Sequence, residues 1–157
     1  DLPKDQRETQ ISDWKELVVL ITINLDEDPT SDAGIEVGRA CSSLLKAMYG
    51  PEHASIKKTI WEKGIKTGKA EKQTGLTPKM VKWLEKAMSA YWKDRLTKIL
   101  SRIGHDPDQT VRFLWEAAQM EMHGKSEELR QTFMDEIYAI DEIPDQVKTW
   151  LKANVSS

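Results

Sequence analysis

Disulfide bonds and membrane spans have little basis in this sequence of 157 residues. Cys41 is the single cysteine, so no internal disulfide can form, and we expect a reducing, intracellular compartment, either cytoplasmic or nuclear. The longest apolar run, Leu17–Ile23, falls far short of the roughly 18 residues that span a bilayer, and Thr22 interrupts it. Asp1–Gln10 is charged and lacks the apolar stretch of a signal peptide, so we expect no secretory leader in this sequence.

Motifs for catalysis and cofactor binding are also missing. The sequence contains no Ser nucleophile elbow, no His-Glu-x-x-His pair and no glycine-rich dinucleotide turn. Gly64 and Gly68 are one residue too close for a phosphate-binding Gly-x-x-x-x-Gly-Lys loop, and Cys41 has no Cys or His at metal-ligand spacing. We therefore predict no enzyme activity, no catalytic residues, no metal ligands and no cofactor.

Apolar residues recur at spacings of three and four along most of the chain, which is the pattern of amphipathic helices. We predict an all-α fold, an irregular bundle of six to seven helices around a long central helix at residues 77–103. Residues 1–10 are predicted to be disordered, and residues 11–157 to form a single helical domain with a flexible basic loop at 64–76. The other expected helices are 11–25 capped by Ser12, 31–49, 51–63, 107–123 capped by Asp106, 126–140 capped by Ser126, and 144–153.

The long helix begins with a strong signal and changes direction half-way. Thr77 is a hydroxyl cap, and Pro78 has the fixed φ that suits the first helical position. After Lys93 the apolar face rotates by roughly 120° around the helix. We expect either a bend or break near Asp94, or two halves that pack against different partners.

Two local features have alternative interpretations. Gly34 and Gly38 lie four residues apart on one helix face, where they permit close helix packing or are simply tolerated weak points, and we favour the second. The β-branched run Leu17–Ile23 is also compatible with a buried strand. We favour a helix there because no second strand is predicted for it to pair with.

Charge is distributed unevenly along the chain, although the net charge is only −3. Residues 1–56 and 103–157 each carry 5 Lys or Arg against 11 Asp or Glu, whereas residues 57–102 carry 13 against 4. Clustered cations are what an anion-binding surface needs. The alternative is that the basic middle folds against the acidic flanks and neutralises itself.

The basic region 57–102 is the candidate binding site. Lysines on a loop and along one helix face can neutralise phosphates without reading bases, which predicts salt-sensitive and sequence-tolerant binding. Trp61, Trp83 or Trp92 would stack on unpaired bases if exposed, although a Trp at helical spacing is more often buried. The residues predicted to contact the polyanion are Lys57, Lys58, Lys63, Lys66, Lys69, Lys72, Lys79, Lys82, Lys86 and Lys93.

The leading functional hypothesis is a non-enzymatic structural or assembly protein that binds nucleic acid, RNA in particular, or another polyanionic surface. A viral matrix, nucleocapsid or capsid-type protein fits this description. An anionic membrane surface is a further candidate partner, and complementary acidic and basic zones also allow self-association. The alternative hypothesis is an adaptor or regulatory helical bundle that binds a protein partner and no nucleic acid.

Four residues suggest a third, enzymatic alternative. His53, the His105-Asp106 pair and a later acid, Asp135 or Asp141, stand in the order of metal ligands in an all-helical chain. In this respect the chain resembles the HD phosphohydrolase superfamily, and the resemblance implies a metal-dependent phosphohydrolase. Pro107 follows the His-Asp pair, however, and favours a capping role for Asp106.

A second resemblance covers under a fifth of the chain. The stretch from His123-Gly-Lys-Ser-Glu127 through Phe133, followed by Val147-Lys-Thr-Trp150, resembles the major homology region of retroviral capsid proteins. His123 stands where that region has Gln, and Asp135 stands where it has Arg. No residue role is transferred from this resemblance.

Overall fold

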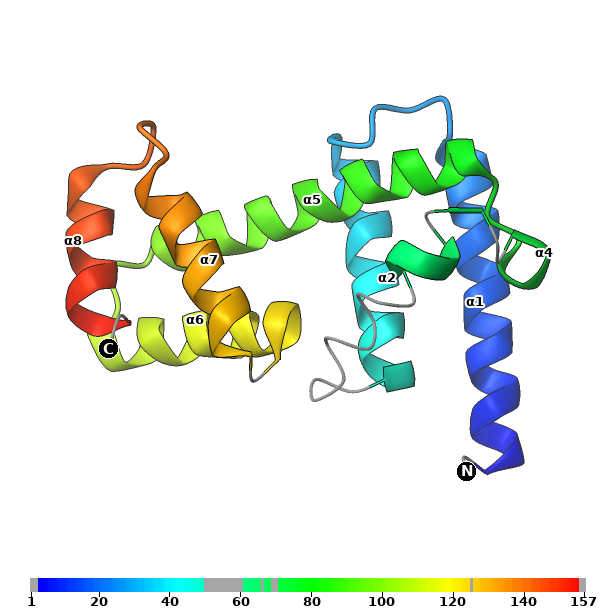
Figure 1. Cartoon of the computed structure of the whole chain (residues 1–157), viewed down its shortest axis with the longest axis horizontal. Coiled ribbons are helices and arrows are strands. Elements are labelled where there is room, and N and C mark those ends of the chain that lie inside the picture. Colours follow the sequence, from blue (N-terminus) through cyan, green and yellow to red (C-terminus); the bar gives the residue numbers. More distant parts are fainter. Residues whose placement is uncertain (1–2, 50–60, 66, 69–70, 125, 156–157) are drawn as a thin grey trace. The chain divides into compact units, whose positions relative to one another are not determined.

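The fold is all-α, as predicted, in a computed structural model that describes residues 3–49, 61–65, 67–68, 71–124 and 126–155 (Figure 1). These ranges contain seven α-helices, one short π-helix and no named strand; a single β-bridge joins Ile103 and Asp106. The helices are α1 Lys4–Asn24, α2 Asp32–Tyr49, the π-helix η2 Trp61–Ile65, α4 Glu71–Thr74, α5 Pro78–Leu100, α6 Asp108–His123, α7 Glu127–Tyr138 and α8 Asp145–Asn154.

Side-chain caps begin three of the helices, two of them, at Thr77 and Ser126, as the sequence predicts. The Thr77 hydroxyl accepts a hydrogen bond from the Met80 amide at the start of α5, at 3.2 Å. Ser126 accepts from the third residue of α7 at 3.2 Å, and Ser31 accepts from the third residue of α2 at 3.3 Å. These bonds satisfy amide groups that have no partner inside their own helix.

Two predicted N-terminal caps, Ser12 and Asp106, are wrong. Helix α1 begins at Lys4 behind Pro3, so residues that we expected to be disordered through Gln10 are helical and Ser12 is no cap. The segment has no Gly or Pro after Pro3 to interrupt it, and Lys4 lies 3.9 Å from the carboxylate of Glu8 one turn later. Asp106 does not cap α6, because its carboxylate accepts from Arg102 at 3.1 Å and Pro107 occupies the cap position.

The expected loop at 64–76 contains more secondary structure than its composition suggests. It includes the end of η2 and all of α4. Ile65 and Leu76 are both buried in the hydrophobic core, and these two apolar side chains give the segment an anchor on each side of α4. The helix predicted at 51–63 lies mostly outside the described residues.

The chain divides into two compact units, where the sequence analysis expected one domain. Unit 1 is Asp1–Asp94 and unit 2 is Arg95–Ser157, so the division falls inside α5. Met80, Leu84 and Ala87 of α5 are buried in unit 1, whereas Leu96 and Ile99 are buried in unit 2. The rotation of the apolar face after Lys93 therefore reflects two halves that pack against different partners.

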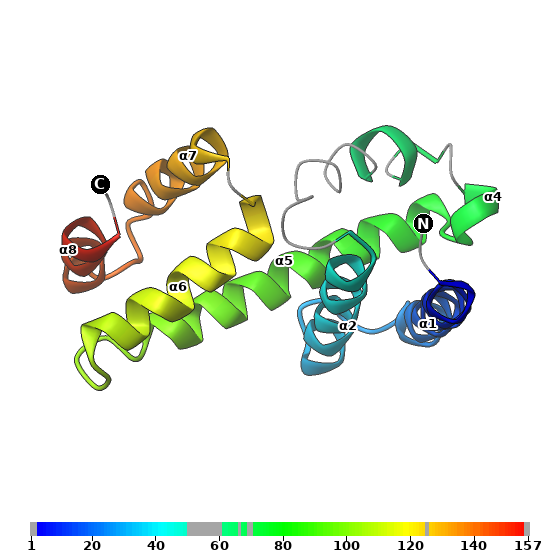
Figure 2. The ribbon, with the colours of Figure 1, turned by 90° about the horizontal axis from the view of Figure 1, so that it is seen from below.

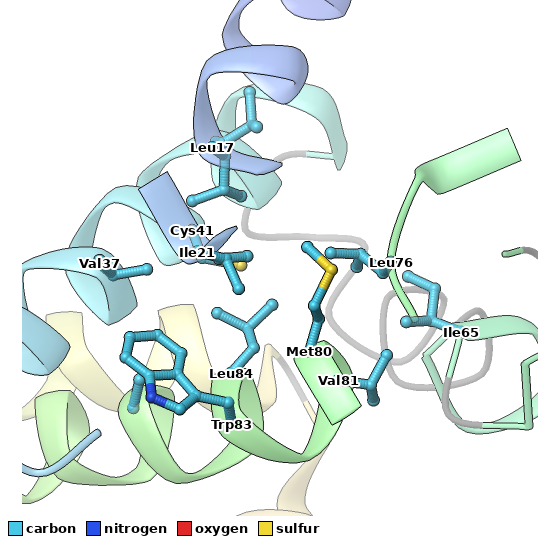
Figure 3. Packing of buried hydrophobic residues seen from close by; sticks show 12 residues of the cluster. Leu17, Ile21, Val37, Cys41, Ile65, Leu76, Met80, Val81, Trp83 and Leu84 are labelled. Atoms are coloured by element: carbon cyan, nitrogen blue, oxygen red, sulfur yellow. The ribbon is translucent and has the colours of Figure 1, made fainter. Parts of the chain in front are cut away.

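Helices α1 and α2 of unit 1 lie side by side and pack with the first half of α5 (Figure 1). Their buried side chains form an apolar core around Leu84 (Figure 3). Two tryptophans fix the surrounding segments, because the Trp14 indole donates to the Thr74 carbonyl at 2.7 Å and Trp83 donates to the Glu27 carbonyl at 2.9 Å. The core residues are Leu17, Ile21, Val37, Cys41, Leu44, Ile65, Leu76, Met80, Val81, Trp83, Leu84 and Ala87.

Gly38 makes the packing between α2 and α5 close. A Cβ atom at this position would lie 2.5 Å from the Ala87 carbonyl oxygen and 3.0 Å from the Tyr91 Cβ. At Gly34, one turn earlier, a Cβ would lie 1.9 Å from the Pro29 carbonyl oxygen. The interpretation that we favoured, tolerated weak points, is wrong: both glycines allow close backbone contacts that no larger residue fits.

Unit 2 is built from α6, α7, α8 and the C-terminal part of α5. Helix α6 runs alongside that part of α5 (Figure 2), and Arg95 forms an ion pair with Glu121. The Trp150 indole donates to the Asp108 carboxylate at 2.9 Å, which ties α8 to the start of α6. The buried side chains in the described part of unit 2 are those of Leu96, Ile99, Val111, Trp115, Ala118, Gln119, Met134, Ile137, Trp150 and Leu151.

Candidate polyanion-binding site

Four of the predicted lysines form a row on one face of α5. Their spacings of three, four and seven residues place Lys79, Lys82, Lys86 and Lys93 within an arc of about 60° and along about 21 Å of helix. All four side chains are exposed. The face opposite carries buried side chains such as Leu84, so the fold of unit 1 directs the lysine row toward solvent.

The other predicted lysines lie elsewhere or outside the described residues. Lys63 is exposed in η2, and Lys72 is exposed in α4. These two belong to unit 1 but not to the row on α5. Lys57, Lys58, Lys66 and Lys69 lie outside the ranges that the structure describes.

Three arginines form ion pairs, whereas no lysine of the row does so within the described residues. Arg39 pairs with Glu36, Arg95 with Glu121 and Arg102 with Asp106, so these guanidinium groups are neutralised inside their own units. Within the described part of unit 1, no carboxylate lies within 4.0 Å of any lysine of the row. Ion pairs therefore engage these three arginines, and the described part of unit 1 contains none for the lysine row.

An acidic connector, residues 26–29, lies beside the row, and the sequence analysis missed this contact. The Trp83 indole, one residue beyond Lys82, holds the connector by its bond to the Glu27 carbonyl. Hydrogen bonds from the amide and hydroxyl of Thr30, at 2.9 and 2.8 Å, lower the pKa of Asp28, with a smaller contribution from the charge of Lys86. Asp26, Glu27 and Asp28 are exposed, so their charges oppose the field of the row without forming ion pairs to it.

The aromatic residues contribute little to this face. Trp83 is buried, and its polar N–H is already used. Trp92 is half-buried, and its ring lies tilted against that of Tyr91 with the centroids 5.2 Å apart. It points about 100° away from the neighbouring Lys93 around the helix. Trp61, in η2, is half-buried against the unit 1 core. The row is therefore an electrostatic surface rather than a stacking platform.

The described residues of the metal-hydrolase resemblance do not come together as a metal site. His53 lies outside the described ranges, and the Asp106 carboxylate accepts from Arg102. Asp135 is exposed and accepts from Gln131 at 2.8 Å, and Asp141 is exposed. Among the residues that the structure describes, no group of three or more His, Cys, Asp or Glu is placed to hold a metal ion.

No protein family, curated protein or solved structure matches this chain. In the part that the structure describes, no helix is both long enough and apolar enough to cross a membrane. The functional interpretation therefore rests on the geometry and charge of the lysine row.

Proposed function

We propose that this protein is a non-enzymatic binding or assembly protein that engages nucleic acid, or another polyanion, through the basic segment 57–102. The observation that carries the proposal is the lysine row: four exposed ammonium groups on one face of α5, without ion-pair partners in the described part of unit 1. A role in a viral matrix, nucleocapsid or capsid is compatible with such binding. The buried free thiol of Cys41 is compatible with a protein that works in a reducing compartment.

The row suits phosphate contacts that carry no sequence information. Lysine acts as a mobile point charge, whereas arginine, whose planar group reads base edges or binds a phosphate through two hydrogen bonds, is absent from the row, and Arg39, Arg95 and Arg102 are held in ion pairs. Four phosphate contacts predict a slope of roughly −3 in the logarithm of the affinity against the logarithm of the salt concentration for a single strand. Binding should therefore weaken steeply with salt and vary little with sequence.

The test is a fluorescence titration of random single-stranded RNA at several salt concentrations. The triple variant Lys79→Glu/Lys82→Glu/Lys86→Glu should lose binding and keep its helical circular dichroism, because the three side chains face solvent. The control variant Lys4→Glu/Lys148→Glu/Lys152→Glu changes the net charge by the same amount as the first variant. It should bind RNA almost as the unmodified protein does. Absence of binding at low salt, or equal losses in both variants, would refute the proposal.

A parallel titration with anionic lipid vesicles identifies the surface that the row recognises. Binding to RNA and not to vesicles supports a nucleic-acid partner. Binding to vesicles alone, removed by the same triple variant, would assign the row to a membrane surface instead.

A further inference from the structure

The acidic connector, residues 26–29, is held along one edge of the lysine row. Trp83 lies about 70° around α5 from the middle of the row, and its indole donates to the Glu27 carbonyl at 2.9 Å. The Asp28 carboxylate accepts from the Thr30 amide and hydroxyl at 2.9 and 2.8 Å, which forms a local turn at the end of the connector. These bonds fix the backbone of the connector beside α5.

The carboxylates of the connector oppose the charge of the row. Asp26, Glu27 and Asp28 are exposed, and the hydrogen bonds from Thr30 lower the pKa of Asp28, so its carboxylate is charged at neutral pH. The charge of Lys86 acts on the same carboxylate, although no ion pair joins these two described residues. Four lysines against three carboxylates leave the row and the connector together with a net charge of only +1.

We propose that the acidic connector is an autoinhibitory element that keeps the affinity of the lysine row for a polyanion low. A carboxylate repels a phosphate strongly only within the screening length, which is about 10 Å at 0.1 M salt. The bonds at Glu27 and Asp28 keep the connector at the edge of the row, so its charges stay close to any polyanion that binds there. This inference rests on the proposed function, because it concerns binding at the same row.

Neutralising the connector tests the inference. In the variant Glu27→Gln/Asp28→Asn the new asparagine keeps an oxygen that can accept from Thr30, and Glu27 is held through its backbone, so the connector should stay in place. The affinity for random single-stranded RNA should rise roughly threefold to tenfold at about 50 mM salt, because two repulsive charges are removed. The gain should shrink as the salt concentration rises, since salt screens the repulsion.

The matched control makes the same two replacements at the far end of α1. Asp5→Asn/Glu8→Gln changes the net charge equally, and both side chains are exposed. Glu8 lies about 24 Å along the helix axis from Asn24, the last residue before the connector, and Figure 1 shows α5 crossing the end of α1 opposite to its N-terminus. This variant should bind RNA almost as the unmodified protein does.

Two further variants show whether the gain acts through the row. Asp26→Asn/Glu27→Gln leaves the turn between Asp28 and Thr30 unchanged and should also raise the affinity. Adding Glu27→Gln/Asp28→Asn to the variant Lys79→Glu/Lys82→Glu/Lys86→Glu should restore little binding, because the lysines that receive the polyanion are then missing. Helical circular dichroism checks that each variant is folded.

The binding of the unmodified protein separates this inference from the proposed function. If the unmodified protein binds RNA through the row and the connector variants gain no more affinity than the control, the connector is not inhibitory and the proposed function stands. If the unmodified protein does not bind and neither connector variant does, both proposals fail. Binding by the connector variants alone would show that the connector blocks the row completely. A gain that persists in the background of the three lysine replacements would assign the effect to another surface and overturn the inference.

Discussion

Unit 1 and unit 2 differ in whether their buried polar side-chain groups are hydrogen-bonded. In unit 1 the indole N–H groups of Trp14 and Trp83 both donate to backbone carbonyls, and the buried side chains of the core are otherwise apolar. In unit 2 the Trp115 indole N–H and both polar atoms of the Gln119 amide are buried with no hydrogen-bond partner among the described residues. Gln119 is only 4% exposed. Among the described residues, the indole N–H groups of the unit 1 core are paired, and the unit 2 core contains an unpaired amide.

The difference has an energetic consequence. A buried donor or acceptor without a partner costs about 1–3 kcal/mol in the free energy of unfolding, and Gln119 contributes one of each. Unit 1 also has the close contact at Gly38, which brings the α2 and α5 backbones together. We therefore expect unit 2 to open more readily than unit 1, as amide hydrogen exchange resolved by residue would measure.

The largest expected change in the free energy of unfolding comes from a substitution at Gly38, where α2 and α5 are in close contact. Gly38→Leu forces a side chain against the Ala87 carbonyl and should lower the free energy of unfolding of unit 1 by about 3 kcal/mol. Denaturant unfolding, with exchange rates for each unit, measures the effect. The control Ala47→Leu adds the same side chain to an exposed position of α2 and should be nearly neutral. Equal effects in the two variants would show that the α2–α5 contact is not close.

A second prediction uses the pH dependence of the unit 1 core. Burial raises the pKa of the Cys41 thiol from its ordinary 9.0 to about 12. Between these values the unfolded chain ionises its thiol and the folded chain does not, so stability is full below about pH 9 and falls as the pH rises. At pH 10 the loss from this group should be about 1.4 kcal/mol.

The comparison that isolates the Cys41 contribution is with Cys41→Ala. Lysines and tyrosines titrate in the same range in both proteins, so only the difference between the two pH profiles reports the thiol. The stability advantage of the unmodified protein over Cys41→Ala should shrink between pH 9 and pH 11. Parallel profiles would mean that the thiol reaches solvent in the folded state.

Local patterns predicted much of the fold, and three-dimensional neighbours decided the rest. Capping chemistry at Thr77 and Ser126 located the starts of two helices, and the rotating apolar face of α5 located the division near Asp94. The role of Gly38 was misjudged because its neighbour, Ala87, is 49 residues away and belongs to another helix. Helical propensity at the N-terminus was underestimated because exposed polar residues show no apolar periodicity.

Local sequence patterns also predicted only part of the candidate site. Helical spacing alone placed four lysines on one face, and the structure leaves that face exposed. Spacing did not show that the arginines would be paired within their units, nor that Trp83 would hold an acidic connector next to the row. Ion pairs and hydrogen bonds between residues far apart in the sequence depend on how helices pack, which periodicity does not report.

The smallest and sharpest test of the comparison between the units replaces the unpaired amide. Gln119→Met keeps the length of the side chain and removes both unsatisfied polar atoms, so unit 2 should gain about 1 kcal/mol in its free energy of unfolding. The control Gln109→Met makes the same replacement at an exposed position of α6 and should change stability little. Thermal unfolding together with hydrogen exchange in α6 and α8 measures the gain. A loss of stability in Gln119→Met would show that the amide is hydrogen-bonded in solution, and the difference between the two cores would then disappear.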